Sequence, residues 1–178
     1  MFEIFQYILL FLAIAVAAIL IYAATKPAHG TTSRSVTIKA PPEKIFPLID
    51  SLRSMNTWNP FVKTDPNLKG DYSGPDSGKG AKYAFDGNKN VGAGHITITD
   101  SVPSSKVTMN LIMTRPFACD NIVQFTLVPA GDTTTVTWAM SGPAPYFMRV
   151  MGTIFNMEKM MQGTFDKGLA DLKAMAER

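Results

Sequence analysis

Six short segments between residues 68 and 140 alternate apolar and polar side chains, and this alternation most constrains the fold. In residues 107–113 every second residue is apolar, and residues 135–140 repeat the pattern. A period of two residues is typical of strands with one buried face. Turns rich in Gly, Pro, Asn and Asp join the segments. We therefore expect an antiparallel meander with strands at 68–73, 80–86, 94–102, 107–113, 121–127 and 135–140.

Residues 146–176 change to a helical period. Their apolar side chains recur every three or four residues and form one stripe, made of Phe147, Met151, Ile154, Phe155, Met161, Phe165, Leu169 and Leu172. The pattern predicts one long helix. Gly152, Gly163 and Gly168 interrupt it, and each glycine indicates either a kink or a place of close packing.

The part before the meander predicts a strand at 34–39, where Val36 and Ile38 share a face. Pro42 and Glu43 then favour the start of a helix. Residues 54–58 continue as a second short helix or a turn. The order is strand, helix pair, six strands, long helix. We expect an α+β helix-grip fold, in which a curved antiparallel sheet of about seven strands wraps around the C-terminal helix.

The order and its residues resemble the helix-grip domains of the START/Bet v 1-like superfamily, and more narrowly its polyketide cyclase/dehydrase-type (SRPBCC) branch. The resemblance covers residues 33–178. It rests on SRSVTIKAPPEKIFPLIDSLRSMNTWNPF at 33–61, YSGPDSGKGAKYAFDGNKNVGAGHITI at 72–98, TTTVTWAMSGP at 133–143 and the Met-rich final helix. It implies a cavity between sheet and helix. The superfamily includes lipid carriers, receptors, allergens and cyclases, so the resemblance names no single activity.

The N-terminal segment is uncharged from Ile4 to Thr25. A helix of this length spans about 33 Å, enough for a hydrocarbon core of roughly 30 Å. We expect a transmembrane anchor at 1–25, a linker at 26–33 and the helix-grip domain at 34–178. A cleaved secretory signal is the alternative, although the segment lacks a basic start and is long for a signal.

The basic residues near the segment predict its orientation. Lys26, Arg34 and Lys39 follow it, whereas no Lys or Arg precedes it. The positive-inside rule then places the domain in the cytoplasm. We expect a single-pass protein of the bacterial inner membrane. The lone Cys119, which excludes an intrachain disulfide, agrees with this location.

Methionine is the residue type most informative about a ligand. Six of the 11 methionines lie in the predicted last helix. Flexible, polarisable Met side chains suit surfaces that adapt to variable apolar ligands, and ordinary core filling is the alternative. With the aromatic residues they predict a cavity lined by Trp58, Tyr83, Phe85, Met109, Leu111, Met113, Trp138, Met140, Met151, Phe155 and Glu158. Trp58 fits the cavity mouth and the closed core equally well.

Two residues are candidate acid/base groups. Helical spacing places Glu158 at the centre of the apolar stripe, where a carboxylate is costly unless it binds a polar group. In a functional role, Glu158 would hold a ligand's polar end or act as an acid or base. In a structural role, it would reach a cation at the rim or accept a hydrogen bond from Trp138 Nε1. His95 is a candidate general base. However, the alternation of the strand places it on the face opposite Ile96, which favours an exposed position.

Other sites and partners find little support. Lys and Arg are dispersed rather than clustered, which argues against nucleic acid, and the net charge is +3. No spacing matches a metal site, and we expect no cofactor. Cys119 is more typical of a small, partly buried residue than of a nucleophile. A cysteine nucleophile needs a nearby histidine, and nothing in the sequence brings His95, the only histidine in the domain, close to it.

The sequence favours a membrane-anchored binding or carrier domain for a small hydrophobic or amphipathic, lipid-like molecule. The rival is a cyclase- or dehydratase-like enzyme that uses Glu158 or His95. Catalysis of this kind needs two cooperating polar groups, and only Glu158 lies on the predicted cavity face. A third alternative is a structural domain whose own side chains fill the space. The sequence does not determine the oligomeric state.

Overall fold

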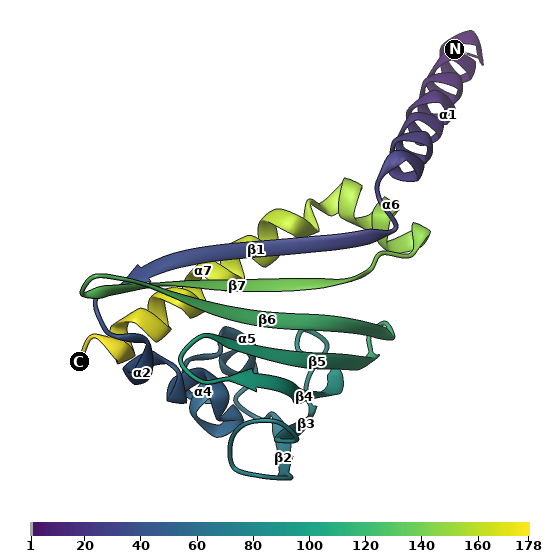
Figure 1. Cartoon of the computed structure of the whole chain (residues 1–178). Helices are drawn as coiled ribbons and strands as arrows, with labels where there is room; N and C mark the ends of the chain where they lie inside the picture. Colours follow the sequence, from purple (N-terminus) through teal and green to yellow (C-terminus); the bar gives the residue numbers. More distant parts are fainter. Residues whose placement is uncertain (1) are drawn as a thin grey trace.

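The computed structural model describes residues 2–178 and has two parts (Figure 1). Helix α1 (Phe2–Thr25) projects away from the rest of the chain, apart from its last turns. It is one uncharged helix from Ile4 onward and is long and apolar enough to cross a membrane, a test that some signal sequences also pass. Residue 1 of the predicted 1–25 anchor lies outside the described residues. The second part is a sheet with one long helix packed against it.

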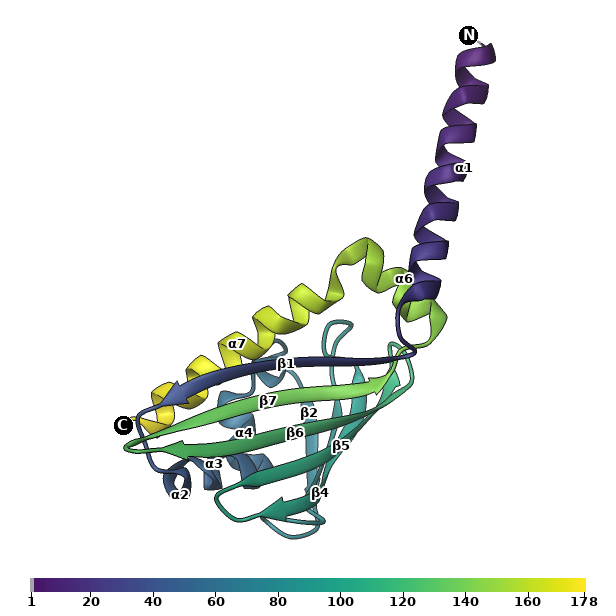
Figure 2. The ribbon, with the colours of Figure 1, turned by 45° about the horizontal axis from the view of Figure 1, so that its top comes forward.

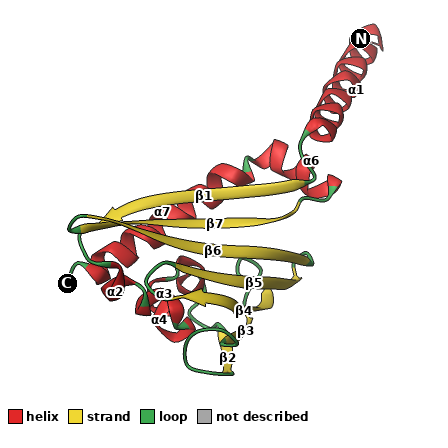
Figure 3. Ribbon diagram, in the orientation of Figure 1, coloured by secondary structure: helices red, strands yellow, loops and turns green. Residues whose placement is uncertain are grey.

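The sheet has seven antiparallel strands in the order β1-β7-β6-β5-β4-β3-β2. The prediction of a helix-grip fold is confirmed, because the sheet curves around helix α7 (Figures 2 and 3). The strands are β1 (His29–Ile38), β2 (Lys69–Ser73), β3 (Lys82–Asp86), β4 (Ala93–Val102), β5 (Lys106–Arg115), β6 (Cys119–Ala130) and β7 (Thr133–Pro143).

The alternation predicted which face of each strand is buried. Val107 and Met109 are buried in β5, as are Phe125 in β6 and Val136 in β7. All four lie on the concave face, which α7 covers. Register shifts in β4 near Gly94 and Ile98 mark bulges. A bulge increases local twist and bends a strand, so these two contribute to the curvature.

The predicted linker at 26–33 is too long. Strand β1 begins at His29, and residues 29–33 pair with Ala139–Pro143 of β7. Small polar residues such as Gly30 and Thr31 carry no apolar period, so the local sequence resembles a linker. The partner strand supplies the hydrogen bonds that make it a strand. Only residues 26–28 connect α1 to the sheet.

The predicted helix pair is a chain of four short helices. They are α2 (Pro42–Ile45), α3 (Pro47–Asp50), α4 (Leu52–Trp58) and α5 (Pro60–Lys63). Three of them begin with proline, whose fixed φ suits the first turn and whose missing N–H is not needed there. Pro47 therefore starts α3.

The predicted long helix is broken at Asn156. Helix α6 (Tyr146–Phe155) ends there and α7 (Met157–Ala176) begins, because Asn156 is left-handed with φ 48° and ψ 48°. Asparagine is among the few residues that adopt this conformation readily. The break changes the direction of the chain, so the apolar residues of α6 do not continue the stripe of α7 (Figure 2).

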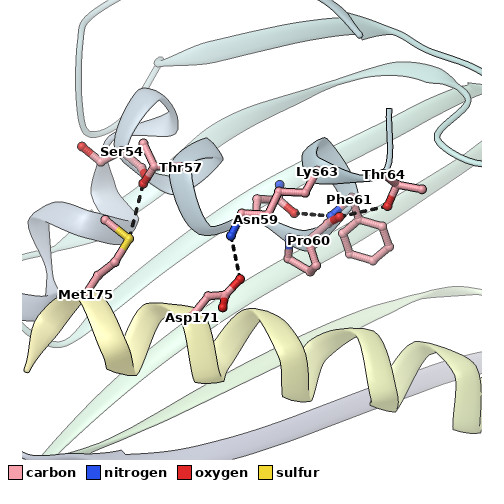
Figure 4. A network of polar contacts seen from close by, with 9 residues as sticks. All are labelled: Ser54, Thr57, Asn59, Pro60, Phe61, Lys63, Thr64, Asp171 and Met175. Atoms are coloured by element: carbon pink, nitrogen blue, oxygen red, sulfur yellow. Dashed lines mark hydrogen bonds and ion pairs between the residues drawn. The ribbon is translucent and has the colours of Figure 1, made fainter. Parts of the chain in front are cut away.

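Helix α7 is held between the sheet and the short helices. Phe165 stacks on Trp138 of β7 with ring centroids 4.2 Å apart. On the other side, Lys63 of α5 donates to Asp171 over 2.6 Å (Figure 4). The Thr57 hydroxyl donates to Met175 Sδ over 3.6 Å (Figure 4). The second half of α7 is therefore fixed on two sides.

Candidate ligand-binding site

The centre of the predicted cavity is filled by aromatic side chains. Trp58 is fully buried and meets Trp138 edge-on, with ring centroids 5.8 Å apart. Phe125 lies 5.1 Å from Trp138, and Phe165 stacks on the other side of that ring. Trp58 Nε1 also donates to the Leu48 carbonyl over 2.8 Å. Of the two interpretations of Trp58, the structure supports the closed core.

Two more predicted ligand residues belong to this core. Met109 is fully buried, and Tyr83 is only 6% exposed. Tyr83 packs on Tyr72, with ring centroids 4.5 Å apart. Burial, together with the nearby Tyr72, raises the pKa of Tyr83 above its ordinary value. Tyr83 therefore stays a neutral phenol at physiological pH.

Toward α6, the concave face remains apolar but is only partly covered. We call this group of half-buried residues the α6-end cluster; its members are Phe85, Leu111, Met113, Met140 and Met161. The register places Phe85 opposite Gly94, and Gly94 opposite Met113. A Cβ on Gly94 would collide with the Ile112 carbonyl oxygen, so glycine at this position lets the β5 backbone approach closely. Four members were predicted ligand residues. The sequence placed Met161 on the helical stripe but did not single it out.

Met151 and Phe155 do not line the space between the sheet and α7. Both belong to α6, and Phe155 is 58% exposed. The prediction extended one helical wheel across Asn156. Because Asn156 is left-handed, the two helices have separate faces.

Glu158 does not face an apolar space either, which corrects its predicted position. Its side chain is exposed and accepts from Gln162 Nε2 over 3.2 Å. It lies at a hollow of about 400 Å³ that also involves Arg34 and Asp166. These two form an ion pair at 3.1 Å between β1 and α7. Trp138 Nε1, one predicted partner of Glu158, has no hydrogen-bond partner among the described residues.

His95 lies on the convex face of the sheet. It pairs with Ala84 and Ile112, and its neighbour Ile96 is buried on the concave side. The structure therefore does not bring His95 and Glu158 together. Across residues 2–178, no group of three His, Cys, Asp or Glu side chains is placed to hold a metal ion.

The comparison with known families covers nearly all of the chain after α1. The family model described as "Polyketide cyclase / dehydrase and lipid transport" matches residues 29–177. The chain belongs to this family. The match begins at the first residue of β1, so the family unit includes the strand residues 29–33 that resembled a linker. No curated protein sequence matches the chain at a significant level.

Solved structures of the same fold are distant in sequence. Protein CV1439 from Chromobacterium violaceum has a TM-score of 0.59 and 16% identity, over 83% of this chain and 97% of that one. The Aha1 dimer from Colwellia psychrerythraea has a TM-score of 0.59 and 19% identity, over 83% of this chain and 96% of that one. Ara h 8.0201 has a TM-score of 0.55 and 11% identity, over 83% of this chain and 97% of that one. At such identities they show the Bet v 1-like fold alone.

Cys119 is a further residue of the site that sequence reasoning missed. It begins β6 directly opposite Met113, and the Asn121 amide donates to its sulfur over 3.4 Å. Strand parity places it on the same face as Val123 and Phe125, next to the α6-end cluster. The signal was available, because residue 119 shares the parity of the buried positions of β6.

We expect Cys119 to react slowly with alkylating reagents. Burial raises the pKa of its thiol, and the thiolate is the nucleophile. At about pH 8, iodoacetamide should therefore modify it more slowly than glutathione, with the rate still rising at higher pH. Mass spectrometry of the full chain at a series of pH values measures this. A rate equal to that of glutathione would contradict it.

Proposed function

We propose that the chain is a membrane-tethered binding or carrier domain for a small hydrophobic or amphipathic molecule with a lipid-like apolar part. The observation that carries this proposal is the α6-end cluster, an apolar stretch of the concave face that the helices leave partly uncovered. Methionines make up three of its five members. Their flexible side chains can move aside for an apolar chain, as rigid ring stacks cannot.

The location of the cluster supports supply from a membrane. The Ala144 amide, just after β7, donates to the Ala28 carbonyl, just after α1, over 2.7 Å. Met140 precedes this link by four residues. The cluster thus lies at the end of the sheet that joins α1. If α1 spans a bilayer, the cluster faces a reservoir of apolar molecules.

A buried donor supports an amphipathic ligand rather than a hydrocarbon. Trp138 is 6% exposed, and its Nε1 lacks a partner among residues 2–178. A buried N–H without an acceptor costs about 1–3 kcal/mol. An oxygen of a bound molecule would remove that cost once the aromatic rings around Trp138 open toward Met140, two residues along β7. The family description, which includes lipid transport, agrees with such a ligand.

The cellular location belongs to the same proposal. We place α1 across the bacterial inner membrane and the domain on its cytoplasmic side, from the positive-inside rule. Lys26, Arg34 and Lys39 carry that inference. The enzyme alternative remains a prediction from sequence, since Glu158 and His95 lie on different faces and no observation pairs either of them with a second polar group in the cluster.

A photoreactive fatty acid tests the proposal. The full chain in phospholipid nanodiscs is incubated with a diazirine-bearing palmitate, irradiated and mapped by peptide mass spectrometry. We expect labels in α1, which meets lipid, and separately in the ends of β5 and β7. Met140→Trp should fill the cluster. A ligand would have to displace the new ring, and a binding cost of about 1.4 kcal/mol corresponds to a roughly tenfold fall in labelling of β5.

Ile122→Trp is the matched control. Ile122 is 52% exposed on the convex face of β6, so the same new ring occupies no part of the cluster. Labelling of β5 should then be unchanged, and labelling of α1 should be unchanged in both variants. Labels confined to α1 in the unmodified chain would overturn the carrier proposal.

A further inference from the structure

Helix α6 is fastened to the last turns of α1. The Tyr146 hydroxyl donates to the Leu20 carbonyl over 2.9 Å. The Arg149 guanidinium donates to the carbonyls of Lys26 and Ala24, over 2.7 and 3.3 Å. The last four carbonyls of a helix have no partner within it, so the contact to Ala24 helps to cap α1. Figure 2 shows α6 directly beside the foot of α1.

These contacts also fix the level of α6 along α1. Leu20 lies within the uncharged run, and Lys26 is the first charged residue after it. Tyr146 therefore sits at the depth of the final apolar turn, and Arg149 at the level of the first charge. In a bilayer, tyrosine and arginine favour this boundary, where one end of the side chain is apolar and the other meets headgroups.

The side of α6 away from these contacts is apolar and uncovered. Phe147, Ile154 and Phe155 share it, whereas Arg149 and Thr153 lie on the opposite side. The turn between β5 and β6 adds Phe117, whose ring centroid lies 5.7 Å from that of Phe147. At the start of α7, directly after α6 in the chain, Met157 and Met160 are also exposed. These six side chains form the α6 patch, and each is between 40% and 68% exposed.

An exposed apolar patch of this extent marks an interaction site. We propose that the α6 patch rests in the headgroup region of the same bilayer that α1 crosses, so that α6 is an interfacial helix. This inference relies on the membrane anchoring of the proposed function. The patch belongs to the helix that lies beside the foot of α1, and none of the most apolar window of α1 is buried. That proximity to a helix able to cross a membrane favours lipid over a protein partner.

The arrangement has a consequence for ligand uptake. Residues Met113 and Phe117 flank the cis-proline turn between β5 and β6, so the α6 patch and the α6-end cluster meet at this turn. A molecule leaving the bilayer would pass from the patch to the cluster without crossing water. The tether and the patch together would hold that route against the membrane, whereas a tether alone would leave it free to rotate.

Spin-label depth measurements test the α6 patch. Nitroxides are attached to the full chain in a Cys119→Ser background, at Phe117→Cys, Phe147→Cys or Phe155→Cys. The chain is placed in nanodiscs of phosphatidylcholine and phosphatidylglycerol. Accessibility to oxygen and to a water-soluble nickel chelate gives the depth. We expect all three labels about 5–10 Å below the water boundary, where interfacial helices lie.

Two further labels separate this inference from the anchor itself. Leu12→Cys, at the middle of α1, reports whether α1 spans the bilayer, and Asp132→Cys, in the exposed β6–β7 turn, reports water. If Leu12 is in lipid but the patch labels match Asp132, the interfacial helix is wrong and the anchor stands. If Leu12 is also in water, both the anchor and this inference are wrong.

A loss-of-contact variant completes the test. Phe147→Ser with Phe155→Ser should move the Phe117→Cys label out of the bilayer into water. Ile122→Ser with Val128→Ser removes side chains of similar exposure, 52% and 59%, from the convex face. That control should leave the Phe117 label at its depth. An unmoved label in the first variant would contradict a role for the patch in holding the domain on the membrane.

Discussion

Replacing Trp58 by alanine is expected to lower the free energy of unfolding by about 3–5 kcal/mol, the range for removing a fully buried aromatic side chain. The indole is fully buried and packs edge-on against Phe125 and Trp138. Its loss also leaves the Leu48 carbonyl without its donor. Urea unfolding of the full chain in nanodiscs, followed by circular dichroism, measures the change.

Two variants give this result its meaning. Trp58→Phe keeps most of the ring and loses the hydrogen bond, so it should cost only about 1–2 kcal/mol. Phe117→Ala removes a ring that is 52% exposed and should change stability by less than about 0.5 kcal/mol. A Trp58→Ala protein that unfolds normally but no longer captures the fatty acid would show that Trp58 contacts ligand rather than closing the core.

Trp58 also shows how far the sequence determines the site. The period of two residues correctly assigned the strands and their faces, because one buried face imposes that period wherever the strand pairs. It did not separate residues that fill the core from residues that remain half-covered. Met109 and Met113 share one face of one strand. Only the position of α7 and Phe165 above the sheet buries the first and leaves the second partly open.

Asn156 explains why the predictions for Met151 and Phe155 were wrong, whereas Glu158 is exposed because the first turn of α7 is uncovered. Asparagine occurs inside helices as well as in left-handed positions, so the residue alone did not predict the break. Contacts far away in sequence fix it, because α6 is capped onto α1 through Arg149 while α7 packs on β7 through Phe165. The helical wheel was correct for α7 from Phe165 onward, where Phe165, Leu169 and Leu172 are buried.

The two glycines of α7 lead to opposite predictions, although the sequence treated them alike. A Cβ on Gly168 would lie 2.8 Å from Pro60 Cδ and 2.8 Å from Trp138 Cζ3, whereas a Cβ on Gly163 would meet nothing within 4 Å. Both atoms near Gly168 belong to rings. Trp138 is held by its stack on Phe165, and Pro60 is held by the α5 backbone, so neither ring can rotate away.

Gly168→Ala should therefore lower the free energy of unfolding by about 1–3 kcal/mol, since overpacking outweighs the helix propensity that alanine adds. Gly163→Ala should raise it by about 0.5–1 kcal/mol, because only the propensity term applies. Urea unfolding of both variants in nanodiscs compares them directly. Equal stabilisation by both would mean that α7 does not pack closely on Pro60 and Trp138. The aromatic core would then have room for a ligand.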